Sequence, residues 1–88
     1  MNALATLRKN VRYLRLARGE SQEAAAARAD LMAKYFQDIE AGRRKGLRLA
    51  TVERIAKALN VEVWEIFQPG RFPKPERLRG KTGARIKR

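Results

Sequence analysis

Residues 21–42 read SQEAAAARADLMAKYFQDIEAG, and this segment carries the clearest local signals of secondary structure. Ser21 offers a hydroxyl oxygen that can cap a helix, and the alanine run after it has high helix propensity. Gly42 directly follows a second segment of helical spacing, and a glycine in this position is typical of a helix end. The pattern therefore predicts two short helices, 22–28 and 32–41, joined by a turn of three or four residues.

Three further segments, 3–17, 49–59 and 62–67, carry apolar residues at helical spacing, and Pro69 follows the last of them. Residues three and four positions apart lie on one face of a helix, so such a face can be buried. In segment 3–17 the apolar face consists of Leu4, Leu7, Val11 and Leu14. In segment 49–59 it consists of Leu49, Val52, Ile55, Ala56 and Leu59. We assign to the core Leu14, Phe36, Ile39, Val52, Ile55 and Leu59. The predicted fold class is an all-α domain of five helices.

The charge of the chain indicates the kind of partner it binds. Twenty-one Lys and Arg side chains oppose nine Asp and Glu among 88 residues, which gives a net charge of +12. Residues 69–88 hold eight basic side chains and one acidic one, and they mix proline, glycine and charge without apolar spacing. We predict a flexible basic tail there, after a domain at residues 1–68. A solvated tail is the simple alternative for residues 69–88, but the whole excess favours a nucleic-acid partner.

Cysteine and histidine are both absent from the sequence. Their absence excludes disulfides and thiolate metal sites, and it removes the commonest metal ligand and general base. We therefore expect no enzyme activity, no metal and no cofactor. No apolar run is long enough to span a membrane, and the first residues lack a signal-peptide pattern. The absence of cysteine and histidine fits a cytoplasmic protein, which we expect here. We expect no membrane contact, because Phe72, Leu78 and Ile86 are too sparse for an amphipathic anchor.

Several short motifs follow one another along the chain in a fixed order. They are Arg15, GESQ at 19–22, Ala26, YF at 35–36, IEAG at 39–42 and TVERIAKAL at 51–59. In residues and spacing these motifs resemble the Xre/Cro family of lambda-repressor-like helix-turn-helix proteins, and the resemblance covers about residues 4–67. It implies a lambda-repressor-like fold that binds double-stranded DNA. The implied function is a transcription regulator, namely a repressor that occupies a palindromic operator as a homodimer.

The resemblance places the helix 32–41 in the major groove, with its first residues against the base edges. The implied base-reading residues are Ala33, Lys34 and Asp38, with Tyr35 and Gln37 beside them. Lys34 would donate to guanine, Asp38 would accept from cytosine N4, and Ala33 would pack on a thymine methyl group. The alternative is that Lys34 and Asp38, four residues apart, form a solvated ion pair.

The same resemblance implies contacts with DNA phosphates before and after the reading helix. The residues concerned are Ser21, Gln22, Arg43, Arg44, Lys45 and Arg48. Such contacts position a protein on DNA without reading its sequence. The alternatives are that Ser21 serves mainly as a helix cap and that the loop after Gly42 is merely solvated. Arg15 and Glu40 match a family ion pair that joins the first helix to the end of the reading helix.

The turn and the start of the reading helix depart from the family pattern. Asp30 stands where the family usually has glycine, although aspartate tolerates the left-handed conformation better than most residues. Met32 stands in place of a capping serine or threonine, so either this cap is lost or Asp30 caps a helix that begins earlier. Because Ala25 replaces a usual leucine, we expect the core there to be filled by Met32, Leu31 or Phe36.

The apolar cluster at residues 63–67 is richer than so small a domain can bury alone. We expect Trp64 or Phe67 to lie at a homodimer contact, with ordinary core as the alternative for Ile66 and Phe67. Two other functions stay open. One is the antitoxin of a toxin–antitoxin pair, with a toxin as the protein partner. The other is a degenerate helix-turn-helix module used only for protein–protein contact.

Overall fold

Residues 2–72 are the part of the chain that the computed structural model describes, and within them the chain forms five helices and no strands. The helices are α1 (Ala3–Ala17), α2 (Gln22–Arg28), α3 (Ala33–Ala41), α4 (Leu49–Ala58) and α5 (Val63–Ile66). The predicted all-α fold is confirmed, and every boundary lies within one residue of its predicted position. None of the helices in this part of the chain is long and apolar enough to cross a membrane. Most of the predicted tail, residues 73–88, lies outside the described residues.

The turn between α2 and α3 is built as its residue types predict. Ser21 accepts a hydrogen bond on Oγ from the backbone N–H of Ala24 at 3.0 Å and so caps α2. Asp30 takes the left-handed conformation with φ 59°, and the backbone N–H of Leu31 then donates back into α2. Met32 occupies the N-cap position of α3 without a side-chain hydrogen bond. The cap of this helix is therefore lost, and it has not moved to Asp30.

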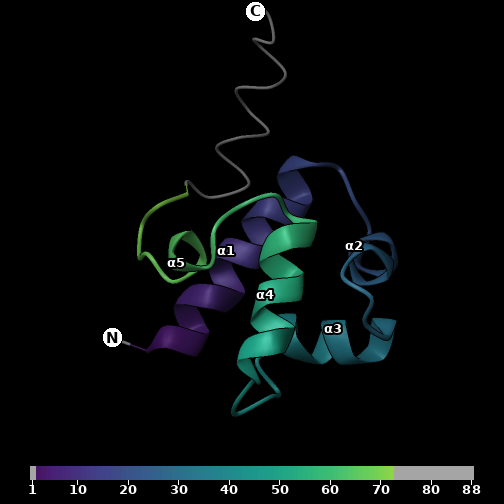
Figure 1. Ribbon diagram of the computed structural model, residues 1–88, viewed down its shortest axis with the longest axis horizontal. Coiled ribbons are helices and arrows are strands. Elements are labelled where there is room, and N and C mark those ends of the chain that lie inside the picture. Colours follow the sequence, from purple (N-terminus) through teal and green to yellow (C-terminus); the bar gives the residue numbers. More distant parts are fainter. Residues whose placement is uncertain (1, 73–88) are drawn as a thin grey trace, which may run out of the picture.

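The helices pack around one core, with α3 along the lower edge of the view in Figure 1 and with α2 and α5 at opposite sides. α3 packs against α1 and α2, and α5 packs against α1 and α4. The buried apolar residues are Leu7, Val11, Ala25, Ala26, Ala29, Phe36, Ile39, Val52, Ile55, Ala56, Ala58, Leu59 and Ile66. The core assignment of Phe36, Ile39, Val52, Ile55 and Leu59 is thus confirmed, and Leu14 packs half-buried against the same cluster.

Two apolar side chains that we considered for burial are in fact exposed. Met32 is 77% exposed and Leu49 is 64% exposed. Both stand at the start of a helix, where the backbone enters from a loop and neighbouring helices do not yet cover the side chain. Of the three residues that we considered for the core beside Ala25, Met32 therefore does not fill it. Phe36 belongs to the same buried cluster as Ala25, and Leu31 packs half-buried against it.

The segment after α5 is fastened to α1. Asn10, which is buried on α1, donates from Nδ2 to the carbonyl oxygens of Ile66 at 2.7 Å and Gln68 at 3.2 Å. The ring of Phe72 stacks on that of Tyr13, with the centroids 5.4 Å apart. The beginning of the region that we assigned to the tail therefore contacts the helical domain.

Arg71 joins the same segment to α5. Its guanidinium group pairs with the carboxylate of Glu65 and lies over the ring of Trp64, 5.3 Å from the centroid. The backbone N–H of Glu62 also donates to Glu65 as part of a capping box. This backbone hydrogen bond, together with Arg71, holds the pKa of Glu65 below its usual value. The ionised form of Glu65 is thus the form that these contacts favour.

Candidate nucleic-acid interface

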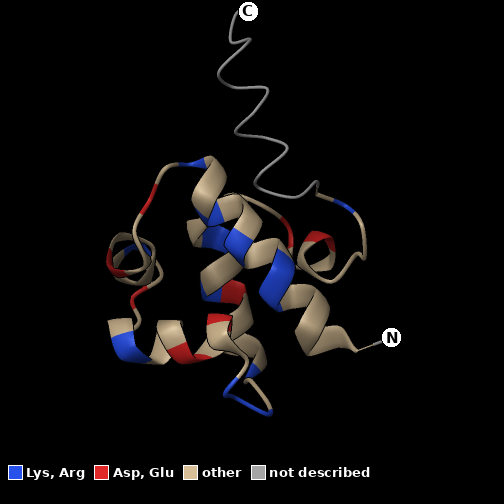
Figure 2. Cartoon of the chain, turned by 180° about the vertical axis from the view of Figure 1, so that it is seen from behind, with Lys and Arg blue, Asp and Glu red and all other residues tan. Residues whose placement is uncertain are grey.

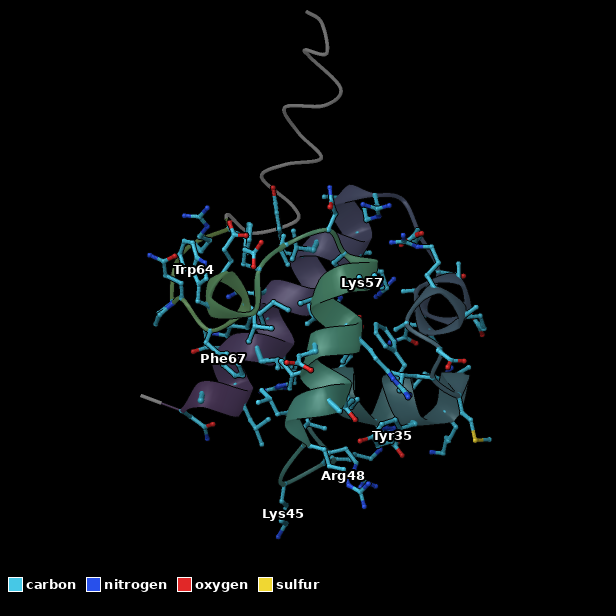
Figure 3. All side chains as sticks on the ribbon, in the orientation of Figure 1. Tyr35, Lys45, Arg48, Lys57, Trp64 and Phe67 are labelled. Atoms are coloured by element: carbon cyan, nitrogen blue, oxygen red, sulfur yellow. The ribbon has the colours of Figure 1, made fainter. Side chains whose placement is uncertain are left out.

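α3 lies at one end of the molecule, and its outer side is uncovered (Figure 1). Phe36, Ile39 and Glu40 form the buried side of this helix. The predicted base-reading residues lie outside that buried set: Lys34 is exposed, whereas Ala33, Tyr35, Gln37 and Asp38 are half-buried. Figure 3 shows Tyr35 at the same end of the molecule as Lys45 and Arg48. The helix that the sequence motifs single out is therefore accessible to a partner along its outer side.

Asp38 already has two basic partners in the free protein. Its Oδ1 lies 3.2 Å from Nζ of Lys34 and 3.5 Å from Nε of Arg43. The first contact is the ion pair that the residue spacing left open as the alternative to base reading. Exposed pairs of this kind contribute about 0.2–1 kcal/mol, so DNA can compete for both side chains. Base reading by Asp38 and Lys34 stays a prediction, and it requires these contacts to give way.

The loop between α3 and α4 is strongly cationic. Its basic residues Arg43, Arg44, Lys45 and Arg48 are all exposed. The guanidinium carbon of Arg44 lies 5.0 Å from the centroid of the Tyr35 ring, a cation–π contact that ties the loop to α3. The side chain of Arg48 does not cap α4, so the partial positive charge of that helix terminus adds to the charge of the loop. Figure 2 shows this loop largely in blue and a further run of basic positions along α1.

Ser21 and Gln22, two of the predicted phosphate contacts, make hydrogen bonds within the protein. Ser21 caps α2 through its hydroxyl oxygen, which is the simpler of the two roles considered for it. Gln22 donates from Nε2 to Oε1 of Glu40 at 2.9 Å and thereby links α2 to α3. This bond uses one amide hydrogen and leaves the amide oxygen and the second hydrogen for another partner.

Arg15 and Glu40 form the ion pair that the family resemblance implies. Nε of Arg15 donates to Oε2 of Glu40 at 2.7 Å, and Nη2 donates to Oε1 at 3.0 Å. Nη1 also donates to the carbonyl oxygen of Glu20 at 2.8 Å. Both side chains are buried, so the forked pair joins α1 to the inner side of α3 without reaching the surface. Together with Gln22 it fixes the position of α3 against two other helices.

Arg8 contacts the end of α3, and no sequence motif pointed to this residue. The guanidinium nitrogen Nη1 of Arg8 lies 3.2 Å from the position that a Cβ on Gly42 would occupy. Gly42 also has φ 82°, a left-handed conformation that favours glycine, and a larger residue there would in addition push the end of the Arg8 side chain aside. A glycine at a helix end was the one available signal, but it does not say which distant side chain approaches it.

Trp64 and Phe67, the predicted dimer contacts, lie away from the cationic loop. Trp64 is 60% exposed on α5, while Phe67 is half-buried and packs against the core. Figure 3 shows Trp64 at the side of the molecule, well separated from Lys45 and Arg48. A partner at Trp64 would therefore leave the outer side of α3 free.

Comparisons with known proteins agree with this geometry. A family model described as a helix-turn-helix domain matches residues 6–65 of the chain. A crystal structure of the hypothetical transcription factor NHTF from Neisseria superposes with a TM-score of 0.74 at 31% sequence identity, covering 89% of this chain and 84% of that one. A search of curated proteins found no match.

Proposed function

The chain belongs to the helix-turn-helix domain family, and we propose that it is a sequence-specific transcription repressor of the Xre/Cro type. In this proposal α3 enters the major groove and Lys34 contacts base edges, while the loop cations contact the phosphate backbone. Two copies would bind a palindromic operator and thereby block a promoter. The proposal includes no enzymatic activity and places the protein in the cytoplasm.

One observation carries the proposal. The outer side of α3 is uncovered, and the loop that follows it presents four exposed basic side chains at the same end of the molecule. A protruding helix flanked by cations is complementary to the major groove between two lines of phosphates. The similarity to the Neisseria hypothetical transcription factor supports the same function. The test is to select bound sequences from a random DNA pool, with an enriched palindrome as the expected result.

Replacing Lys34 and Arg44 separately by alanine should separate base reading from phosphate binding. Lys34→Ala should cost about 1–3 kcal/mol on the selected operator and relax the preference at one base pair. Arg44→Ala should weaken binding to all sequences alike. The slope of log K against the logarithm of the salt concentration should become shallower by about 0.9 for each phosphate that is no longer neutralised. Affinities for the operator and for a scrambled duplex, each titrated over several salt concentrations, provide the measurement.

The control for both variants is Lys57→Ala, because Lys57 is exposed on α4 and Figure 3 shows it far from Lys45 and Arg48. It should change neither affinity nor salt dependence. A wild-type protein that shows no preference among DNA sequences at about 150 mM salt contradicts the proposal. That result would leave the degenerate module for protein–protein contact as the remaining function.

A homodimer through α5 is the second part of the proposal, because one reading helix covers only half of an operator. The large exposed ring of Trp64 supports it. We expect sedimentation of the wild type at high micromolar concentration to give a dimer, and Trp64→Glu to give a monomer of unchanged helicity. Met32→Glu is the matched control, since Met32 is a comparably exposed apolar residue at another helix. A monomeric wild type would rule out this dimer.

Trp64 also favours one alternative, the antitoxin of a toxin–antitoxin pair. In that case the exposed ring would bind a toxin, and the same helix-turn-helix domain would regulate the shared operon. A small toxin that is encoded by a neighbouring gene, and that co-purifies with the wild type but not with Trp64→Glu, would support this alternative.

A further inference from the structure

A hollow beside the end of α3 has the features of an anion site. It has a volume of about 340 Å³ and lies between the N-terminal part of α1, the end of α3 and the loop after it. Arg8, Arg44 and Lys45 line it together with Gly42, over an apolar floor that includes Leu7. Among the described residues that line the hollow, none is acidic. Three basic residues from two separate segments therefore line one space, and no carboxylate is among its lining residues.

These three cations are available to an outside anion. Within residues 2–72, neither Arg8 nor Arg44 nor Lys45 forms an ion pair, although six such pairs occur elsewhere in that part of the chain. Placing like charges together costs free energy unless an anion neutralises them. Gly42 contributes room, because a Cβ at that position would press on the guanidinium group of Arg8. The guanidinium group of arginine also matches the geometry of phosphate oxygens.

The hollow adjoins the proposed DNA-binding side of α3. Arg44 both lines the hollow and lies over the ring of Tyr35 on α3, so one side chain belongs to both surfaces. A helix that presents its first residues to the bases brings its far end and the following loop toward the backbone of one strand. The hollow is at that far end.

We propose that Arg8, with Arg44 and Lys45, binds a backbone phosphate of the DNA and so extends the contact with the duplex from the loop onto α1. This inference rests on the proposed function. The simpler explanation is that Arg8 acts only within the protein, where its charge stabilises the C-terminal end of the α3 dipole. The two roles differ in one measurable respect, because only binding to a phosphate changes the dependence of DNA affinity on salt.

The test compares Arg8→Gln with Arg8→Lys and with Lys57→Gln. Arg8→Gln should make the slope of log K against the logarithm of the salt concentration shallower by about 0.9 for each phosphate that loses its cation. At about 0.1 M salt this change corresponds to roughly eightfold weaker binding of every sequence. Arg8→Lys keeps the charge and should keep the slope even if packing on Gly42 suffers. Lys57→Gln removes a distant charge and should leave the slope unchanged. Thermal unfolding of each variant measures separately any decrease in its stability.

An unchanged slope in Arg8→Gln overturns the inference but not the proposed function, provided that the wild type still prefers one DNA sequence. A wild type that binds DNA without sequence preference overturns the proposed function. Even in that case, a shallower slope in Arg8→Gln would support the binding of a DNA phosphate by Arg8. Inorganic phosphate distinguishes a free anion from DNA. One outcome would overturn the inference: inorganic phosphate raises the unfolding temperature of the wild type but not of Arg8→Gln, and the two proteins show the same salt dependence of DNA affinity. The hollow would then bind a free anion and not a phosphate of DNA.

Discussion

Replacing Arg15 by alanine should lower the free energy of unfolding by about 3–5 kcal/mol. Its partner Glu40 has a side chain only 2% exposed, so the variant would leave a carboxylate buried with the amide of Gln22 as its remaining partner. A decrease of this size approaches the whole stability of a small domain, about 5–15 kcal/mol. Thermal unfolding followed by circular dichroism should show a midpoint more than about 10 °C lower.

Two further variants show whether the unpaired charge is the cause. Arg15→Met combined with Glu40→Met should recover much of the stability, because apolar pairs often replace buried ion pairs at little cost. Arg28→Ala removes an exposed ion pair to Glu20 and should cost less than about 1 kcal/mol. If the double variant is as unstable as Arg15→Ala alone, the hydrogen bonds of this network and not its charges determine the stability.

Under the proposed function, the same network should also affect DNA binding. Arg15 and Gln22 both hold Glu40, which lies on the inner side of α3, so α1 and α2 together set the angle of that helix. Base contacts depend on small displacements, since a bidentate hydrogen bond tolerates little change in distance or direction. A variant that stays folded at low temperature without this pair should therefore bind DNA less selectively as well as unfold earlier.

The five helices were predictable because local signals agreed with one another. Apolar spacing indicated the helical faces, and Ser21 and Gly42 marked two of the ends. Of the two roles left open for Asp30, the structure has the left-handed turn residue, a conformation that aspartate tolerates better than most residues. These are interactions between residues a few positions apart, which a single sequence displays directly.

The parts that could not be predicted depend on where distant segments meet. Asn10 bonds to carbonyl groups 56 and 58 residues away, and nothing near it in the sequence indicates those acceptors. The approach of Arg8 to Gly42 and the stacking of Phe72 on Tyr13 are of the same kind. The sequence motifs therefore indicated α3 and the loop after it, but they did not indicate that Arg8 of α1 lies beside them.

Met32 and Phe36 show the limit of apolar spacing most directly. They are four residues apart and were both considered for the same buried space, yet Phe36 is 1% exposed and Met32 is 77% exposed. Spacing places two residues on one side of a helix, but it does not say how far along that helix the neighbouring elements extend. Met32 lies just before the first turn of α3, beyond that cover.

Phe36→Ala should therefore lower the free energy of unfolding by about 3–5 kcal/mol, whereas Met32→Ala should change it by less than about 0.5 kcal/mol. The first variant opens a cavity where α3 packs on α1 and α2, and the second removes a side chain that already faces solvent. Because Phe36 fastens α3 to the core, the same variant should under the proposed function lose DNA binding at temperatures where the wild type still binds. Equal decreases of stability in the two variants would mean that Met32 is buried in solution, and the angle of α3 against the core would then differ from the one described.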